Sequence, residues 1–577
     1  MQSTSSKPVL RVALPLPLRQ LFDYLPEENG VVPIVGQRVL VPFGHRKLVG
    51  VIVEVSDRSD LPLDKLATVI DYPDGEQTVL TIEVLALLKW CWRYYKHAPG
   101  EVVFNALPPL LRKIGKVIPG APVQYRLTPA GETRLLEPRG RIKAQIGLLE
   151  AIHQGAVTEA QLRAFAPTWR KTLARLLEQQ WVQAEPQQAA MLNPVSGPEL
   201  MQEQRLAVDA INLSHDEFHC HLLDGITGSG KTEVYLQVLE QVLARGGQAL
   251  LLVPEIGLTP QLLNRFRDRL GFEPVVTHSG LSEGQRLQAW AIARSGLARL
   301  VIGTRSALFL PIPGLQMIIL DEEHDASFKQ QDGFRYSSRD VAVKRAAGLA
   351  IPVVLGTATP SLETFNNAMG NRYSWHRLRK RATGALEPRW RVLDLIQQTM
   401  TGGISSIAMK AIGETLDKSE QALIFLNRRG YAPVILCHEC GWHGACEQCD
   451  ANLTWHKVSH RLLCHHCDSV ARVPVMCPAC GADALQGAGE GTEQLEQVLA
   501  KAFPETPLLR FDRDSIRKKG EFERLAAQVK TGESCLLVGT QMLAKGHHFP
   551  KVTLVVIVNL DQALYSADFR ALERMGQ

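Results

Sequence analysis

The stretch that decides the fold is Gly225-Ile226-Thr227-Gly228-Ser229-Gly230-Lys231-Thr232, which matches the pattern G-x-x-x-x-G-K-[ST] at every position. An apolar strand candidate at 220–223 precedes it and a helical run at 233–244 follows it, as the pattern requires. Glycines let backbone N–H groups surround phosphate oxygens, and the helix N-terminus adds a positive field. We therefore expect these eight residues to bind ATP, with Lys231 on the β- and γ-phosphates and Thr232 on Mg²⁺.

The acidic partner of such a loop should follow another apolar strand. Met317–Leu320 is an apolar run, and Asp321-Glu322-Glu323-His324 comes directly after it. We expect Asp321 to hold Mg²⁺, directly or through water, and Glu322 to orient and deprotonate the attacking water. For this tetrapeptide taken alone, a solvent-exposed acidic turn is the alternative.

Apolar runs of a few residues alternate with helical stretches from about residue 200 onward, which predicts α/β layers with parallel sheets. Upstream, residues 1–110 have strand composition punctuated by proline and glycine, with one helix over 82–95. Residues 140–185 predict three short helices and a strand, with Thr158 and Gln161 capping the second helix. This pattern suggests a winged helix, and a plain helical linker domain is the alternative.

Eight of the eleven cysteines lie between Cys437 and Cys480, in four C-x-x-C pairs with spacers of 5, 14 and 9 residues. Each pair is half of a tetrahedral Cys₄ site, so eight thiolates predict two structural Zn²⁺ ions, whereas a redox role would need only one isolated pair. The 14-residue spacer suits a ribbon hairpin, and the outer pairs would meet across its base. The expected sets are Cys446, Cys449, Cys464 and Cys467, and Cys437, Cys440, Cys477 and Cys480. Rival ligands are His438, His443, His465 and His466, but eight thiolates already complete two sites.

The composition, with 45% hydrophobic and 21% charged residues, excludes a fully disordered chain. A net charge of +5 over 577 residues neither shows nor excludes nucleic-acid binding. No apolar run approaches the roughly 18 residues of a membrane span, and one of the longest, Val552–Val558, predicts a buried strand. The first 17 residues do not form a secretory signal. We therefore expect a cytoplasmic protein without membrane association. Disulfides are rare in the cytoplasm.

The motifs resemble those of the superfamily 2 helicases. Asp321–His324 has the DExH form, and Gly356-Thr357-Ala358-Thr359-Pro360 is similar to the motif that couples ATP state to DNA contact in that family. Other segments resemble its strand-contacting loops, 253–259 and 302–306, and motifs of its second lobe, 425–430 and 538–546. Leu200 and Gln204 resemble the segment that flanks the adenine. The resemblance implies two RecA-like lobes and places Gln204 in the nucleotide site.

The cysteine insert narrows the resemblance to the replication-restart helicases, and the resemblance covers residues 8–577. The N-terminal domain of that family captures the 3′ end of a leading strand at a fork. The segments 21–26 and 41–44 are similar to that domain, so the resemblance implies a 3′-end pocket lined by Phe22, Asp23 and Gly44. The family also has a lysine a little beyond these segments. In the nearest register this sequence has Ala67 at that position, and Lys65 lies two residues before it.

Aromatic residues and arginine interleave within a dozen residues after His324, at Phe328, Phe334, Arg335 and Tyr336. Such a loop suits base stacking on single-stranded DNA and resembles the aromatic-rich loop of the family. An aromatic anchor in the core of the lobe is the alternative. Candidate phosphate contacts are Arg305, Arg428 and Arg429, for each of which a solvated surface arginine is the alternative.

We therefore expect an α/β fold of two RecA-like helicase lobes with a cysteine-rich zinc insert in the second lobe, preceded by a β-rich 3′-end-binding domain and a winged-helix domain. The expected boundaries are 1–112, 113–195, 196–410 for lobe 1 and 411–577 for lobe 2, with the insert at 437–480. The resemblance implies an ATP-dependent 3′→5′ DNA helicase that recognises stalled or repaired replication forks and initiates primosome assembly. Its implied partners are forked and single-stranded DNA, primosome proteins and single-stranded-DNA-binding protein. The alternatives are a fork-binding scaffold with a dispensable ATPase and another superfamily 2 translocase.

The last superfamily 2 motif, Q-x-x-G-R-x-G-R, is not found, and the sequence ends about where the family enters it. We therefore expect a truncated chain that binds ATP and DNA but hydrolyses ATP slowly, because the missing arginines would stabilise the charge of phosphoryl transfer.

Overall fold

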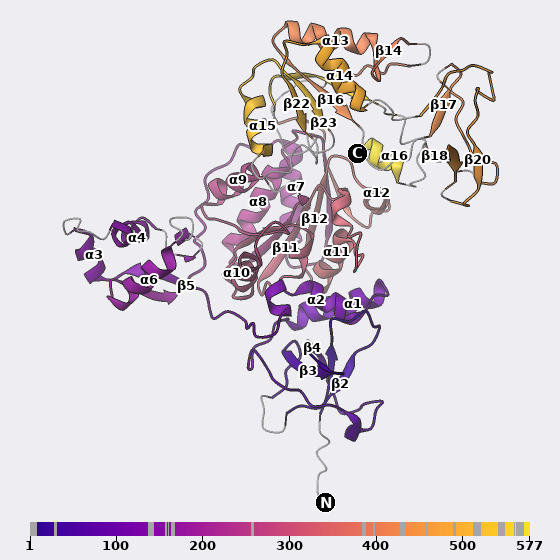
Figure 1. Cartoon of the computed structure of the whole chain (residues 1–577). Helices are drawn as coiled ribbons and strands as arrows, with labels where there is room; N and C mark the ends of the chain where they lie inside the picture. Colours follow the sequence, from indigo (N-terminus) through magenta and orange to yellow (C-terminus); the bar gives the residue numbers. More distant parts are fainter. Residues whose placement is uncertain are drawn as a thin grey trace, which may run out of the picture. The chain divides into compact units, whose positions relative to one another are not determined.

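The computed structural model describes residues 8–577 except 28–31, 137–142, 156–157, 160, 163–167, 256–258, 383–387, 396–397, 427–433, 438, 450, 457–459, 465, 488–491, 512–520, 540–548, 559 and 561–569. The chain divides into two compact units, Met1–Ala385 and Leu386–Gln577, each of which is described by itself. Figure 1 shows the elements of both units. Within the described residues, no helix is long and apolar enough to cross a membrane.

The N-terminal part of the first unit is an antiparallel sheet followed by two helices. The described strands pair in the order β2-β1-β4-β3, with β1 Val9–Ala13, β2 Phe22–Tyr24, β3 Arg38–Phe43 and β4 Arg46–Ser56. Helix α1 spans Ile82–Tyr94 and α2 spans Pro99–Ala106. A buried ion pair, Arg38 Nε to Asp74 Oδ2 at 2.6 Å, lies inside this part of the unit. Arg38 also donates to the carbonyls of Leu111 and Lys116, which fixes the chain as it leaves α2.

A smaller helical element follows. A two-stranded antiparallel ribbon, β5 Val123–Leu127 and β6 Val182–Pro186, encloses helices α3 Pro129–Leu136, α4 Lys143–His153 and α6 Trp169–Glu178. The predicted cap is present, because the Thr158 backbone N–H donates to Gln161 Oε1 at 2.9 Å. The first and third predicted helices and the strand lie close to the predicted ranges, whereas most of the second helix falls outside the described residues, and the assignment as a winged helix stays a prediction.

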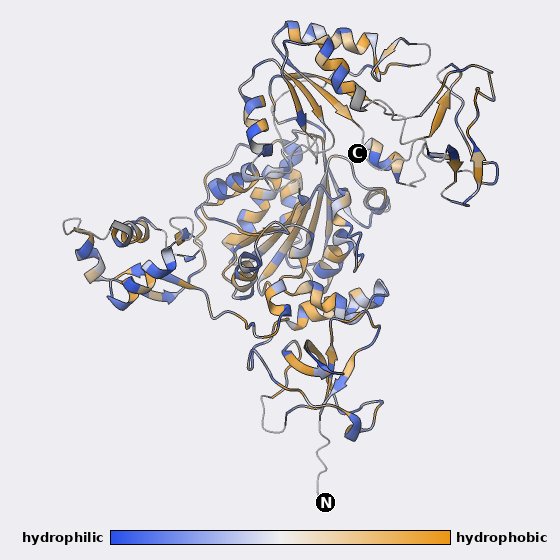
Figure 2. Cartoon of the chain, in the orientation of Figure 1, coloured by the Kyte–Doolittle hydropathy of each residue, from blue (hydrophilic) through white to orange (hydrophobic). Residues whose placement is uncertain are grey.

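The rest of the first unit is a parallel sheet covered by helices. Among the described residues the seven strands run in the order β13-β7-β12-β11-β8-β10-β9. Their bounds are β7 Cys220–Gly225, β8 Gln248–Leu252, β9 Val275–Thr277, β10 Leu300–Gly303, β11 Leu315–Asp321, β12 Val353–Thr357 and β13 Ser374–Leu378. The covering helices are α7 Gln202–Leu213, α8 Lys231–Ala244, α9 Pro260–Leu270, α10 Glu283–Arg294, α11 Ser338–Leu349 and α12 Leu362–Met369. Figure 2 shows apolar residues concentrated on these strands, as expected for a sheet buried on both faces.

One hydrophobic core joins this sheet to α1 and α2. It contains Leu88 and Cys91 of α1, Val103 of α2, and Phe309 and Val341 beyond the sheet strands. Figure 1 shows α1 and α2 between the N-terminal strands and the larger sheet. The N-terminal sheet and the nucleotide-binding sheet therefore belong to one packed body, although the sequence predicted a domain boundary near residue 112.

The second unit carries a smaller parallel sheet and the cysteine insert. The described strands pair in the order β22-β23-β16-β24, with β16 Gln421–Leu426, β22 Leu508–Phe511, β23 Leu536–Gly539 and β24 Val552–Val558. Its helices are α13 Ser406–Asp417, α14 Thr492–Ala502, α15 Glu521–Lys530 and α16 Ala571–Gly576, and a short hairpin joins β14 Met400–Thr401 to β15 Ile404–Ser405. The insert contributes β17 Ile435–Cys437, β18 Thr454–His456, β19 Arg461–Leu463, β20 Val470–Arg472 and β21 Leu485–Gly487.

The prediction that 552–558 is a buried strand was wrong. In β24, Val555 is 53% exposed and Ile557 is 41% exposed. The physical reason is that β24 lies at the edge of the described sheet, with alternate side chains facing away from the core.

Candidate nucleotide, metal and DNA sites

The phosphate loop has the predicted geometry. Strand β7 ends at Gly225 and helix α8 begins at Lys231, whose Nζ donates to the Gly225 carbonyl at 2.9 Å. Gly228 and Gly230 have φ of +81° and +82°, a region that favours glycine. A Cβ on Gly230 would also lie 2.4 Å from Gln204 Nε2. Glycine is therefore required at position 230 for two independent reasons.

Gln204 is buried against the phosphate loop. Its Nε2 donates to the Ser229 carbonyl at 2.8 Å, and its Oε1 accepts from the Met201 backbone N–H at 2.8 Å. These bonds place the start of α7 beside the loop, as expected for a segment near the nucleotide. The contact of Gln204 with adenine stays a prediction.

Asp321 lies at the end of β11, which is separated from β7 in the sheet by β12. The hydroxyl of Tyr235, from α8, donates to Asp321 Oδ1 at 2.9 Å. Burial, and then the charge of Asp321, raise the pKa of Tyr235 well above its usual value, so the hydroxyl remains a donor. Tyr235 also packs against Gly356, where a Cβ would lie 1.6 Å from the hydroxyl oxygen. Sequence reasoning missed Tyr235, because no motif marks it.

The DExH segment is tied to the Gly-Thr-Ala-Thr-Pro segment. Glu322 has a left-handed φ of +53° and its carboxylate lies 3.5 Å from His324 Nδ1. The same Nδ1 lies 2.6 Å from Thr357 Oγ1, and the Thr359 backbone N–H donates to that hydroxyl at 3.0 Å. His324 therefore contacts both Glu322, the predicted general base, and Thr357 of the predicted DNA-coupling segment.

Glu323 was not assigned a role from the sequence, yet its carboxylate is buried and bound by several groups. It is 2% exposed and accepts bonds from the Ser361 backbone N–H at 2.7 Å, the Ser361 hydroxyl at 3.0 Å and the Thr364 hydroxyl at 3.0 Å. Arg339 Nη1 lies 3.3 Å away and compensates its charge. Glu323 therefore fixes the start of α12 to the acidic strand end.

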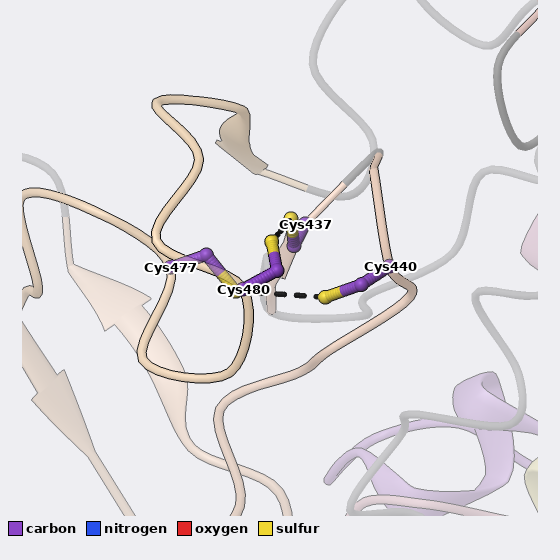
Figure 3. A group of neighbouring side chains, drawn as sticks. All are labelled: Cys437, Cys440, Cys477 and Cys480. Atoms are coloured by element: carbon purple, nitrogen blue, oxygen red, sulfur yellow. Dashed lines mark hydrogen bonds between the residues drawn. The ribbon is translucent and has the colours of Figure 1, made fainter.

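The eight cysteines form the two predicted sets. Cys437 Sγ lies 3.7 Å from Cys480 Sγ, and Cys440 Sγ lies 3.6 Å from Cys477 Sγ. Figure 3 shows these four side chains converging from two separate turns. In the second set, the Sγ pairs are 3.6 Å apart for Cys446 and Cys467 and 3.5 Å apart for Cys449 and Cys464. Within each set all four sulfurs lie within 4.8 Å of one another, which confirms the nested pairing.

These distances fit zinc. Zn–S bonds of about 2.3 Å in a tetrahedron place the sulfurs about 3.8 Å apart, so each set can hold one ion without rearrangement. A hydrogen bond with the Ser469 hydroxyl is the main cause that lowers the pKa of Cys446 to about 6. Among the described residues, neither set includes a histidine, and His438 and His465 lie outside the described residues.

The residues predicted for the 3′-end pocket are close together. The Phe22 and Phe43 rings meet edge to face with centroids 5.4 Å apart, and Phe43 precedes Gly44 in the β3–β4 turn. Gly44 has φ of +57° and open space at its Cβ position. Asp23 accepts a hydrogen bond from the Ser59 hydroxyl at 2.6 Å and lies 3.9 Å from Arg11 Nε. Ser59 is a member of this site that the sequence did not indicate.

The base-stacking prediction for Phe334 and Tyr336 was wrong in this structure. Phe334 is 3% exposed and Tyr336 is 0% exposed, and their rings stack with centroids 4.7 Å apart. Phe334 also meets Tyr95 of the N-terminal part, with ring centroids 5.7 Å apart. The two rings complete the shared core, which was the alternative. Arg335, between them, is exposed.

The predicted phosphate contact Arg305 is bonded within the protein. Its Nη1 donates to the carbonyls of Ser327 at 2.9 Å and Lys329 at 3.3 Å. This arginine therefore anchors the segment after the DExH motif, and its contact with DNA stays a prediction. Arg428, Arg429 and residues 540–546 of the second-lobe motif lie outside the described residues.

Family comparisons agree with three parts of the chain. Residues 11–108 match the 3'DNA-binding domain (3'BD), residues 201–368 match the DEAD/DEAH box helicase family, and residues 446–472 match the PriA DNA helicase Cys-rich region (CRR) domain. Among solved structures, the chain resembles the DUF1998 helicase MrfA bound to DNA, with a TM-score of 0.38 and 12% identity over 64% of this chain and 49% of that one. It also resembles RecG bound to a three-way DNA junction, with a TM-score of 0.37 and 16% identity over 66% and 45%.

Curated relatives match almost the whole chain. The Replication restart protein PriA of Haemophilus influenzae is 43% identical over 99% of this chain and 79% of its own length. The proteins of the same name from Bacillus subtilis and Chlamydia pneumoniae are 35% and 36% identical, over 96% and 97% of this chain and 78% and 77% of their own lengths. With identity at this level over nearly its full length, the chain belongs to the PriA family of replication restart proteins.

Proposed function

We propose that this chain is an ATP-dependent DNA helicase that moves 3′→5′ on DNA and acts in replication restart at stalled or repaired forks. The observation that carries the proposal is the single packed body that contains both the phosphate loop with its acidic strand end and the N-terminal site of Phe22 and Asp23. In this proposal one compact unit both holds a DNA end and hydrolyses ATP.

In this proposal, different residues of the first lobe bind the phosphates, bind Mg²⁺ and activate water. Lys231 and the backbone of residues 225–230 hold the phosphates, and Thr232 and Asp321 hold Mg²⁺. Bound Mg²⁺ supplies positive charge to the β- and γ-phosphate oxygens. Glu322 orients the attacking water and takes its proton. His324 and Thr357 support the coupling of this step to DNA, because their contact at 2.6 Å joins the general base segment to the Gly-Thr-Ala-Thr-Pro segment.

The cysteine insert holds two Zn²⁺ ions in this proposal and stabilises a protein-docking or DNA-facing surface. Its proposed partners are forked DNA, primosome proteins and single-stranded-DNA-binding protein. The support is the family membership and the two Cys₄ sets, whose ligands come from segments that would not fold stably without a metal.

The test is strand separation on forks that differ in which strand carries a free end, with Lys231→Ala as the control. We expect any strand separation to require ATP and to run in the 3′→5′ direction, and we expect none from Lys231→Ala. Fork binding and primosome loading that persist fully in Lys231→Ala, with no unwinding by the unsubstituted protein, would support the scaffold instead.

A further inference from the structure

A pocket of about 460 Å³ lies where the N-terminal part meets the nucleotide-binding lobe, outside the sites described above. Three segments that are distant in sequence line it, through Arg19, Tyr95, Lys96, His97, Gly333 and Arg335. Arg19 precedes β2, the next three residues follow the end of α1, and the last two belong to the loop after the DExH motif. The pocket therefore exists only because these two parts of the unit are packed together.

The walls of the pocket are held firmly. The Ser337 backbone N–H donates to the Tyr95 hydroxyl at 3.2 Å, and the Tyr95 ring meets Phe334 edge to face. At the other end of α1, Glu83 binds Arg345 of α11 with both oxygens at 2.9 Å. Because the Arg345 side chain is fully buried, this contact fixes α1 against the lobe. These contacts hold two of the three lining segments against each other.

The lining is cationic. Arg19, Lys96 and Arg335 are exposed, and none of the described residues that line the pocket is acidic. A fourth cation lies beside them, because the Lys329 ammonium is 5.5 Å from the centroid of the Tyr95 ring and donates to the Arg335 carbonyl at 2.8 Å. His97 is paired with Glu101, with Nε2 and Oε2 2.6 Å apart. Several positive charges thus surround a concave surface, which concentrates an anionic ligand.

The burial of the two aromatic rings explains the direction of Arg335. Because Phe334 and Tyr336 are both buried in the core, the residue between them is turned outward. Lys96 has a left-handed φ of +52° directly after α1, and the His97 backbone N–H donates to the Trp92 carbonyl at 3.1 Å, which is how many helices end. The aromatic residues of this loop therefore position a cation and do not themselves receive bases.

We propose that this pocket binds the phosphodiester backbone of single-stranded DNA. The proposal rests on the proposed function, because the strand in this pocket would be the one whose 3′ end the N-terminal site binds. Arg19 is only three residues before Phe22, so the pocket continues the N-terminal DNA site toward the lobe. Arg335 contributes from the lobe side, on the segment that Arg305 anchors behind the DExH motif. One strand would then touch both parts of the unit through its phosphates, independently of base sequence.

The test measures how binding of a single-stranded oligonucleotide with a free 3′ end depends on salt. Each phosphate contact to a single strand contributes a slope of about 0.7 in log affinity against log salt concentration. We expect Arg19→Ala, Lys96→Ala and Arg335→Ala each to reduce that slope by about 0.7, and Arg19→Lys and Arg335→Lys to retain it. Arg372→Ala, which removes an exposed cation between α12 and β13, is the matched control and should bind as the unsubstituted chain does.

Three further measurements separate the outcomes. An oligonucleotide with an abasic backbone should show the same losses, because the contacts are to phosphates. Affinity for a fluorescent ATP analogue and the thermal unfolding midpoint should not change, which excludes misfolding. Unchanged slopes in all three alanine variants would overturn the proposal while leaving DNA binding intact. A chain that binds no single-stranded DNA at all would instead refute the proposed function.

Discussion

Replacing Tyr235 by phenylalanine removes one hydroxyl and leaves the ring in place. That hydroxyl donates to Asp321 Oδ1 at 2.9 Å from a side chain that is 2% exposed. The close approach of Gly356, where even a Cβ would lie 1.6 Å from the hydroxyl oxygen, leaves little room for water to replace it. In Tyr235→Phe the predicted metal ligand therefore loses the donor that Tyr235 supplies.

The expected magnitude follows from the charge of the acceptor. A hydrogen bond to an ionised group contributes about 1.5–3 kcal/mol. If this bond holds the Asp321 carboxylate in the orientation that Mg²⁺ needs, loss of about 1.5 kcal/mol raises the half-saturating Mg²⁺ concentration roughly tenfold. Affinity for the nucleotide without metal should stay the same, because the residues that hold the phosphates are not altered.

The assay is binding of a fluorescent ATP analogue, titrated with Mg²⁺ and repeated in excess chelator. Tyr373→Phe is the matched control, since it removes a hydroxyl from the same lobe but away from Asp321; burial raises the pKa of Tyr373 to about 12, so it too is a protonated phenol. A Tyr235→Phe variant whose Mg²⁺ requirement equals that of Tyr373→Phe would refute the argument. Equal losses with and without Mg²⁺ would mean that the hydroxyl supports the fold alone.

Four other predictions concern separate parts of the chain. Metal analysis should find two Zn²⁺ per chain, and Cys446→Ser should release one of them, with the remaining ion measured by the same analysis after dialysis. Forks with a 3′-hydroxyl leading strand should bind more tightly than forks with a 3′-phosphate, because the phosphate would repel Asp23, and fluorescence anisotropy at matched salt would show it. Glu83→Ala should destabilise the first unit by about 3 kcal/mol in urea unfolding, because it leaves the buried Arg345 guanidinium without its carboxylate. Burial, and then His376, lower the pKa of His221 to about 3, so the unfolded chain takes up its proton first as pH falls below about 6.5; stability should decline between that pH and about 3, and His221→Asn should flatten the decline in thermal unfolding at pH 7 and pH 5.

The sequence was sufficient where chemistry is encoded by neighbouring residues. The phosphate loop needs glycines at fixed spacing: Gly230 has a left-handed φ of +82°, and a Cβ on Gly225 would lie 2.5 Å from Ser229 Oγ. The cysteine sets were predictable for a related reason, since the spacers between the pairs limit which pairs can meet. In both cases a short segment determines its own geometry almost independently of the rest of the fold.

Sequence reasoning failed where the partner of a residue lies far along the chain. Phe334 and Tyr336 have the composition of a base-stacking loop, and only the packing of Tyr95 and Phe309 against them decides that they are buried. Tyr235 lies on a buried face of α8, so its hydroxyl is indistinguishable in the sequence from any core tyrosine. Its role depends on the tertiary approach of β11 and β12, which no local pattern specifies.

The packing of α1 gives a physical basis for communication between the DNA end and the ATP site. Arg345 binds Glu83 of α1 and also donates to the carbonyls of Leu308 at 2.7 Å and Leu310 at 3.0 Å, at the end of the segment that begins with Arg305. Arg305 in turn holds Ser327, three residues beyond His324. If α1 moves, Arg345 either loses hydrogen bonds while its charge stays buried, which is costly, or keeps them. If it keeps them, segment 305–310 must move with α1 or hold α1 in place. A continuous set of hydrogen bonds therefore joins α1 to the segment that follows the DExH motif.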